Sequence, residues 1–196
     1  MTSSPAAFPS AGAALLHRIR VDEYHRMIDA GILGEDDRVE LLEGLIVNMS
    51  PQKPPHALVI ERLTDPLFTG LPGAYRVRCQ LPLTLADSEP EPDVAVVPRQ
   101  GRHAAQHPAS ALLIFEVARR SLRHDREVKG RIYARAGVAE YVIVDLRRRQ
   151  LEVWRNPAAT EGRYLARTVV GAADVFASVS VPGFTVPVSD LLADIG

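Results

Sequence analysis

The chain has 196 residues, of which 46% are apolar and 24% charged, as is ordinary for one globular domain. No apolar run approaches the roughly 18 residues that a membrane span needs, so we expect no membrane partner. A net charge of −1 argues against binding nucleic acid through overall charge, which leaves such binding to local patches.

The N-terminus and the cysteine content indicate the compartment. The short apolar stretch AGAALL has no basic residue before it, which argues against a secretory signal. The single cysteine, Cys79, excludes an internal disulfide and fits a reducing compartment. We therefore expect a cytoplasmic protein with a loose leader over residues 1–20 and a single domain over residues 21–196.

The first half of the chain predicts two helices and three strands. In order, these are a helix over 21–30, strands over 38–42 and 45–50, a helix over 56–68 and a strand over 75–85. Gly31 closes the first helix, and Glu43-Gly44 joins the first two strands as a hairpin. Pro82 is typical of an edge strand or a bulge.

The second half predicts the centre of a sheet. Strands are expected over 93–97, 111–117, 141–145, 151–155, 162–170 and 175–181, and helices over 121–137 and 188–195, with Ser121 and Ser189 as possible N-caps. The run ALLIFEV is continuously apolar, as in a strand covered on both faces. Strand, helix and strand in succession form a βαβ crossover, so the sequence predicts an α/β fold with a mixed central sheet.

Two carboxylates stand at the ends of apolar strands. Asp93 opens DVAVV, and Glu116 nearly closes ALLIFEV. A buried carboxylate is costly unless it is paired, hydrogen-bonded or bound to a metal. Hard oxygen ligands at neighbouring strand ends suit Mg²⁺ or Mn²⁺. The alternative is two acids that face solvent at the strand ends.

Lys129 is one of only two lysines among 23 basic residues. A lysine can orient or polarise an attacking water, so its presence on an arginine-rich helix suggests a catalytic role, although chance would also explain it. Asp125 lies four residues earlier on the same helical face. It either forms an ordinary i,i+4 ion pair or orients the lysine.

Positive charge gathers beside the second of these strands. From Val117 to Arg135 the chain has seven basic residues and two acids, a local charge of +5. This pattern predicts either a solvated helix face or a surface for nucleic-acid phosphates, with Arg119, Arg120 and Arg123 nearest to Glu116. A second basic run is 147–149.

Other candidates carry weaker signals. Glu40 is either a hairpin surface acid or a side chain that faces the site, and His56 is either a plain helix-start histidine or a phosphate contact. His103 and His107 have the spacing of a zinc pair, but no third ligand follows, so we interpret the spacing as coincidence. Cys79 has no base nearby in sequence, so we expect it to be a buried structural thiol.

Four segments in this order resemble one known family. They are GILGEDDRVELLEGLIVNMSP, then His56, then SEPEPDVAVV, then FEVARRSLRHDREVKGRIYARAGVAEYVIVDL. Together they are similar to the Uma-type restriction endonuclease family of the PD-(D/E)XK superfamily, from about Val21 to the C-terminus. The resemblance implies a restriction-endonuclease-like fold, to which the N-terminal hairpin is an addition.

The resemblance also implies a site. Asp93 and Glu116 would bind the metal, with the backbone carbonyl of Val117 completing the shell. The usual superfamily lysine position is Ala118 here, and the family resemblance places the lysine on the following helix, at Lys129. Arg119 and Arg120 stand where similar chains carry small polar residues, and they would either hold phosphate or pair with the carboxylates.

The main hypothesis is a Mg²⁺-dependent endonuclease that hydrolyses DNA phosphodiester bonds. The alternative is a catalytically silent module on the same fold that binds nucleic acid or protein. A third hypothesis is a hydrolase of another phosphate substrate, because a fold does not dictate its substrate. The apolar strands and small size also favour a homodimer.

Overall fold

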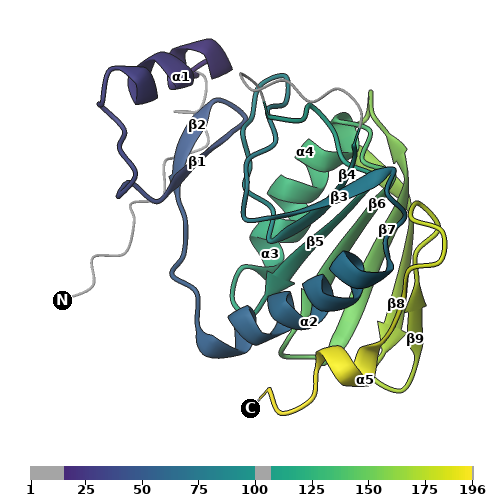
Figure 1. Ribbon diagram of the computed structural model, residues 1–196. Helices are drawn as coiled ribbons and strands as arrows, with labels where there is room; N and C mark the ends of the chain where they lie inside the picture. The colour runs from purple at the N-terminus through teal and green to yellow at the C-terminus, as the bar shows by residue number, and fades with distance from the viewer. Residues whose placement is uncertain (1–15, 100–106, 196) are drawn as a thin grey trace.

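A computed structural model describes residues 16–99 and 107–195 of the chain (Figure 1). Most of the expected leader and His103 lie outside the described residues. Residues 16–20 form no helix or strand, but the Ile19 N–H donates a hydrogen bond of 2.9 Å to the Gly44 carbonyl. No helix in the described ranges has the length and apolar character to cross a membrane.

A six-stranded mixed sheet forms the centre of the fold. Its order is β3 (Tyr75–Cys79), β4 (Val94–Pro98), β5 (Leu113–Ala118), β6 (Glu140–Asp145), β7 (Gln150–Ala158) and β8 (Arg163–Gly171). Only β5 and β6 pair in parallel, and the other neighbours are antiparallel. The β5–helix–β6 crossover supplies this parallel pair, as predicted.

Two hairpins stand outside the main sheet. The predicted N-terminal hairpin is β1 (Val39–Leu42) with β2 (Leu45–Asn48), which turns at Glu43-Gly44. A second hairpin, β9 (Val175–Ala177) with β10 (Thr185–Pro187), lies near the C-terminus. The mixed sheet and the added N-terminal hairpin are therefore confirmed.

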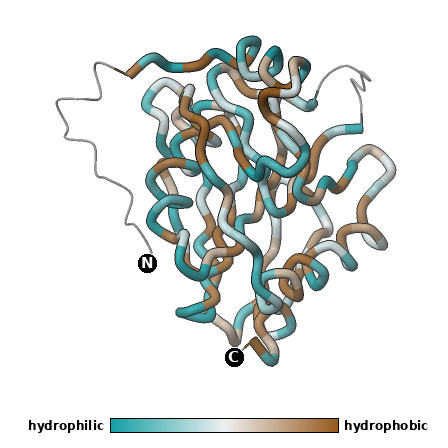
Figure 2. The backbone as a smooth tube through the Cα atoms, turned by 90° about the vertical axis from the view of Figure 1, so that its left-hand side faces the viewer, coloured by the Kyte–Doolittle hydropathy of each residue, from teal (hydrophilic) through white to brown (hydrophobic). Residues whose placement is uncertain are grey.

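Each face of the sheet carries its own hydrophobic core. On one face, Leu63 and Leu67 of α2 (Pro54–Gly70) and Leu191 of α5 (Val188–Leu191) pack against residues such as Val96. On the other, Tyr133 of α4 (Gly130–Arg135) packs with Ala95, Ile114 and Leu42 of the hairpin. Because neighbouring strand residues face opposite cores, the central strands β5 and β6 are buried at every position. Figure 2 shows hydrophobic and hydrophilic segments interspersed along the backbone.

The helix after β5 differs from the expected continuous α-helix over 121–137. It begins as α3 (Leu122–His124), continues through a π-turn, η2 (Asp125–Lys129), and ends as α4. The Gly130 N–H donates to the Asp125 carbonyl, five residues back. Ser121 precedes the helix, but its side chain makes no capping hydrogen bond because its backbone is already helical.

Three further expectations near chain turns were wrong in extent. The strand over 75–85 ends at Cys79, because Gln80 takes a left-handed φ of 50°. The strand over 175–181 stops at Ala177. The helix over 188–195 is the single turn α5, with Pro187 and not Ser189 at the N-cap position, and the Ser189 hydroxyl donates to Asp190.

Candidate active site

Asp93 and Glu116 lie side by side at one edge of the sheet. β4 and β5 are antiparallel, with Val94 opposite Phe115, so one step further along this register places Asp93 opposite Glu116. The Asp93 Oδ2 accepts a 2.7 Å hydrogen bond from the Val117 N–H, and both carboxylates are buried. The strand-end acids therefore do not face solvent.

Lys129 reaches these acids from the helix that follows β5. Its Nζ is 3.0 Å from Glu116 Oε1 and 3.2 Å from Glu40 Oε2. Lys129 is buried, so both ion pairs are largely withdrawn from water. The Tyr133 hydroxyl donates a 2.7 Å hydrogen bond to the same Glu116 oxygen. Tyr133 was not predicted, although its position four residues after Lys129 on a helix was an available signal.

Glu40 is buried beside Lys129 and is not a hairpin surface acid. It is buried on β1, and besides the Lys129 ammonium its Oε2 accepts the Glu91 N–H at 3.2 Å. Glu91 lines the same cavity as Glu40 and was not predicted from the sequence, although it stands two residues before Asp93. The N-terminal hairpin thus carries one carboxylate of the site.

The π-turn explains the position of Asp125. In an α-helix, residues four apart stack on one face, but Asp125 and Lys129 bound a turn closed by an i→i+5 bond. Of the two alternatives for Asp125, the ion pair with Lys129 is absent among the described residues, where Lys129 pairs with Glu116 and Glu40. Asp125 is buried, and its Oδ2 has no hydrogen-bond partner among the described residues.

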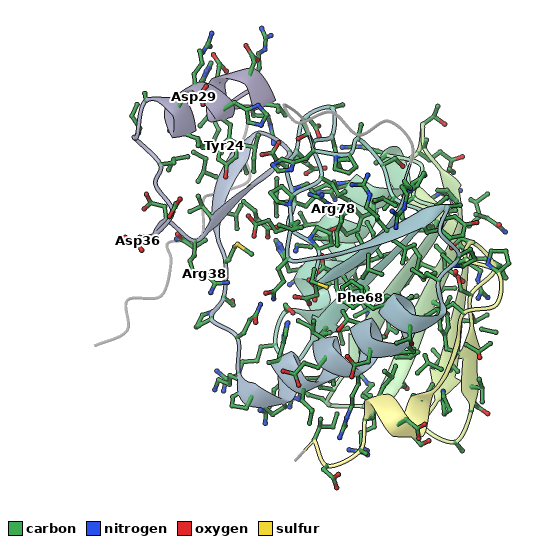
Figure 3. The ribbon with its side chains drawn as sticks, viewed as in Figure 1. Tyr24, Asp29, Asp36, Arg38, Phe68 and Arg78 are labelled. Atoms are coloured by element: carbon green, nitrogen blue, oxygen red, sulfur yellow. The ribbon has the colours of Figure 1, made fainter. Side chains whose placement is uncertain are left out.

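His56 lies at the start of α2 and contacts the site directly. Its Nε2 is 2.9 Å from the Asp93 Oδ1, so both oxygens of Asp93 have partners. Arg38 lies at the base of the hairpin, on the side that faces α2 (Figure 3). A histidine at a helix start therefore belongs to the site through a carboxylate contact.

These groups surround one cavity of about 330 Å³, which we call the carboxylate cavity. Its charged lining has five acids and three permanent cations. The acids are Glu40, Glu91, Asp93, Glu116 and Asp125, and the cations are Arg38, Arg120 and Lys129. His56, His124 and polar residues of the hairpin complete it. This excess of carboxylates attracts cations.

Burial and mutual repulsion set the protonation of these groups. Burial raises the pKa of Glu116 well above its usual value. The nearby Lys129 ammonium lowers this pKa, and the carboxylates of Asp93, Asp125 and Glu40 raise it further. For Lys129, burial favours the neutral amine, but Glu116, Glu40 and Asp125 outweigh it and raise the pKa. Burial is also the main cause of the raised pKa of Glu91. Lys129 therefore remains a cation here.

The three predicted arginines occupy different environments. Arg120 lines the carboxylate cavity, while Arg119 lines a different cavity nearby. Arg123 is exposed and donates to Glu127 at 2.9 and 3.1 Å, so it is part of an ordinary i,i+4 pair. Neither Arg119 nor Arg120 pairs with the site carboxylates among the described residues.

The donor set fits a hard divalent cation. Asp93 and Glu116 supply carboxylate oxygens at adjacent strand ends, and the unpartnered Asp125 Oδ2 lines the same cavity. Over residues 16–99 and 107–195, no group of three or more His, Cys, Asp or Glu side chains is arranged to hold a metal ion. Mg²⁺ is commonly held by one or two carboxylates with water and substrate oxygens, so two suffice.

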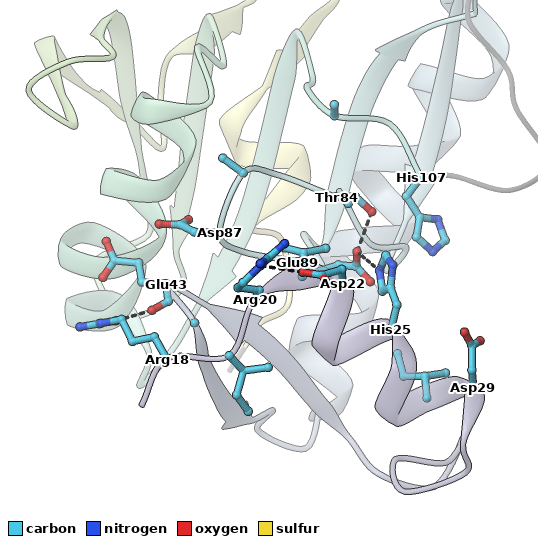
Figure 4. Close-up of a pocket in the computed structure, with 16 residues that line it drawn as sticks. Arg18, Arg20, Asp22, His25, Asp29, Glu43, Thr84, Asp87, Glu89 and His107 are labelled. Atoms are coloured by element: carbon cyan, nitrogen blue, oxygen red, sulfur yellow. Dashed lines mark hydrogen bonds and ion pairs between the residues drawn. The ribbon is translucent and has the colours of Figure 1, made fainter. Parts of the chain in front are cut away.

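A larger cavity, of about 880 Å³, lies between α1 (Val21–Asp29) and the loop before β4 (Figure 4). There the Glu89 Oε2 is 2.7 Å from His25 Nε2 and accepts the Thr84 hydroxyl at 2.6 Å. His107 also lines it. This larger cavity shares no lining residue with the carboxylate cavity, so it contains neither Asp93, Glu116 nor Lys129.

Cys79 lies outside both cavities. It is half-buried and not fully buried as predicted, because it ends the edge strand β3. Burial raises the pKa of its thiol, which favours the unreactive protonated form.

Comparisons with known proteins identify the fold and the family of the chain. One solved structure, described as "Crystal structure of a putative nuclease belonging to DUF820 from Anabaena variabilis ATCC 29413", has a TM-score of 0.64 and 16% sequence identity. The match covers 89% of this chain and 97% of that one, and it supports the predicted restriction-endonuclease-like fold. No curated protein sequence matches the chain. The model of the Uma2 family, described as "Putative restriction endonuclease", matches residues 21–189, so the chain belongs to the Uma2 family.

Proposed function

We propose that this protein is a Mg²⁺- or Mn²⁺-dependent endonuclease that hydrolyses phosphodiester bonds in DNA. The observation that carries the proposal is the convergence of Asp93, Glu116 and Lys129 on one acid-rich cavity. Membership in a family described as "Putative restriction endonuclease", and a structural neighbour described as "a putative nuclease", support the same reaction class.

The metal would be held by Asp93, Glu116 and the Val117 carbonyl. When bound, it would supply Lewis-acid stabilisation of the negative charge that develops on the phosphoryl oxygens. Asp93 is oriented for this task by the Val117 N–H and by His56, and Glu116 by Tyr133. Such contacts fix a ligand's direction before the metal arrives.

Lys129 would act as a cationic hydrogen-bond donor. Because its pKa is raised, Lys129 stays protonated and would not accept a proton from the attacking water. Its ammonium would instead orient that water or a phosphate oxygen, while Glu40 holds the ammonium toward the cavity at 3.2 Å. Arg120, on the same cavity, would contact a substrate phosphate.

The experiment is cleavage of supercoiled and linear DNA with Mg²⁺, Mn²⁺ or EDTA. Asp93→Asn and Lys129→Met should each abolish metal-dependent cleavage. Asp65→Asn, which changes an exposed acid of α2 outside the cavity, should leave it intact. Full activity of the Asp93→Asn protein would refute the site assignment.

The second candidate function is a non-catalytic module that binds nucleic acid or protein. It is favoured by one observation: the chain's own groups already occupy the main site atoms. His56 and Val117 engage both Asp93 oxygens, and Lys129 bridges Glu116 and Glu40. DNA binding that is insensitive to EDTA, with no cleavage by folded protein under any metal, would select this candidate.

We also propose that residues 21–196 act as one domain in the cytoplasm and assemble as a homodimer. The edge strand β8 supports the assembly, since Leu165 and Val169 are exposed on it. An unpaired strand edge with apolar side chains can bind a second strand. A monomeric mass by light scattering at micromolar concentration would exclude the dimer.

A further inference from the structure

A third cavity, smaller than the carboxylate cavity, opens where β5 and β6 end. Its volume is about 280 Å³, and it is lined by Pro55, Arg119, Leu146, Arg147, Arg149 and Ile195. Three of these six residues are arginines, and none is an acid. Leu146 and Ile195 are buried and give the cavity an apolar floor. Its lining is thus opposite in charge to the carboxylate cavity.

The three arginines are not equivalent. The Arg149 guanidinium donates to the carbonyls of Leu192 at 2.6 Å and Ile195 at 3.3 Å, which holds it as part of the wall. Arg119 and Arg147 are exposed, and across residues 16–99 and 107–195 their guanidinium groups make no ion pair or hydrogen bond. Their donors therefore remain free for a ligand.

The backbone fixes where Arg147 stands. Its N–H donates to the buried Asp145 Oδ1 at 3.0 Å, and the neighbouring Arg148 satisfies that acid through its own N–H and side chain. Asp145 is therefore occupied within the turn and does not neutralise Arg147. Two free guanidinium groups over an apolar floor suit an anion with several oxygens, and phosphate matches their forked geometry.

The two cavities are neighbours along the chain. Pro55 lines the arginine-rich cavity and His56 the carboxylate cavity; likewise, Arg119 lines the first and Arg120 the second. The two cavities therefore adjoin at the start of α2 and just after β5. A nucleic-acid strand that placed one phosphate in the carboxylate cavity would carry a nearby phosphate toward Arg119 and Arg147.

We propose that Arg119 and Arg147 form a phosphate-binding subsite that holds a neighbouring backbone phosphate of the strand to be cleaved. This inference rests on the proposed function for its polymeric substrate. Its chemistry, two unpaired arginines that bind a phosphate group, is independent of whether cleavage occurs. The subsite would position the strand and would take no part in bond breaking.

The first test is the salt dependence of binding to a short DNA duplex in EDTA, with Arg119→Gln, Arg147→Gln and the double variant. The double variant should bind at least about fivefold more weakly, and the slope of log K against log salt should fall by about 0.9 for the lost phosphate contact. Arg163→Gln is the control, because Arg163 pairs with Glu161 at the opposite end of the sheet. An unchanged affinity and slope in the double variant would overturn the proposal.

The second test separates this subsite from the reaction site and from a free-phosphate site. If the metal-dependent reaction occurs, the double variant should cleave bis(p-nitrophenyl) phosphate normally but show a raised KM for duplex DNA. Arginine Nε–H NMR signals of the Asp93→Asn protein should shift with duplex even if cleavage never occurs. Shifts with inorganic phosphate alone would overturn the backbone assignment in favour of a free anion, and shifts with neither probe would overturn the subsite.

Discussion

Replacing Lys129 by methionine tests whether the carboxylate cavity depends on a single buried cation. Methionine keeps the approximate length of the side chain and removes its charge. The ammonium lies 3.0 Å from Glu116 and 3.2 Å from Glu40, and all three residues are buried. The chain offers a matched control, because its only other lysine, Lys53, is exposed just before α2.

The expected loss is large because the variant leaves buried carboxylates without their counterion. Breaking a buried ion pair from one side typically costs about 3–5 kcal/mol, whereas an exposed charge is worth about 0–1 kcal/mol. The free energy of unfolding of the Lys129→Met protein should therefore fall by about 3–5 kcal/mol at pH 8. The Lys53→Met protein should stay within about 0.5 kcal/mol of the parent.

The sign of the pH dependence follows from the pKa directions. Lys129 opposes the burial that raises the pKa of Glu116, so its removal raises that pKa further. An acid whose folded pKa is raised binds protons more readily when folded, so stability recovers as pH falls. The deficit of Lys129→Met should thus shrink between pH 8 and pH 5. In the parent, the raised pKa of Lys129 means that its contribution is lost only above about pH 10.4.

Urea unfolding followed by the fluorescence of Trp154, the only tryptophan, measures these differences. A shift of the midpoint without a change of slope reports stability itself. Mg²⁺ should stabilise Lys129→Met more than the parent, because a bound cation would offset the repulsion that the lysine no longer relieves. A deficit below about 1 kcal/mol at pH 8, equal to that of Lys53→Met, would refute the buried-pair reasoning.

Two further predictions concern the hairpin that carries Glu40. Glu43→Gln removes a carboxylate that two arginines of α4 contact at 2.7 and 2.9 Å. The hydrogen bond from Arg131 is the main cause of the lowered pKa of Glu43, so its stabilisation holds above about pH 4.5 and is lost as pH falls through the folded pKa. Thermal unfolding should show a loss of about 1 kcal/mol at pH 7, after allowance for screening, that shrinks as pH falls below about 4.5; a pH-independent gap would contradict this. Gly44→Ala should lower the free energy of unfolding, measured in urea, by at least about 1 kcal/mol more than Gly31→Ala. Both glycines have a positive φ, but a Cβ on Gly44 would lie 2.7 Å from a neighbouring carbon, whereas a Cβ on Gly31 would meet no atom within 4 Å. Equal losses would show that the chain segment before α1 relaxes.

The fold was predictable where local patterns and burial agree. The continuous apolar run that became β5 and the Glu43-Gly44 turn each specified one structure. Failures cluster where the backbone departs from a regular period. Gln80 ends β3 with a left-handed φ, and β10 is a strand of only three residues, too short for alternation to reveal.

The residues of the candidate site that follow from local sequence patterns were predictable, but those that depend on packing between distant segments were not. Asp93 and Glu116 were visible as acids at the ends of apolar strands. Glu40 looked like a surface acid, because hairpin alternation does not reveal which face another element will cover. Its burial comes from the hairpin's position, which the described Glu43 contacts with α4 help to fix. Glu91 became part of the site for the same tertiary reason.

The π-turn links these local errors to the proposed chemistry. A regular helix would have stacked Asp125 on Lys129 and allowed the pair to neutralise each other. The i→i+5 turn instead leaves Asp125 Oδ2 unpartnered in the cavity and lets Lys129 pair with Glu116 and Glu40. π-turns are often found at functional sites, where an irregular backbone re-aims side chains. Under the proposed function, the lysine that the superfamily pattern would place at Ala118 would instead come from the next helix, where the helical irregularity keeps Lys129 from pairing with Asp125.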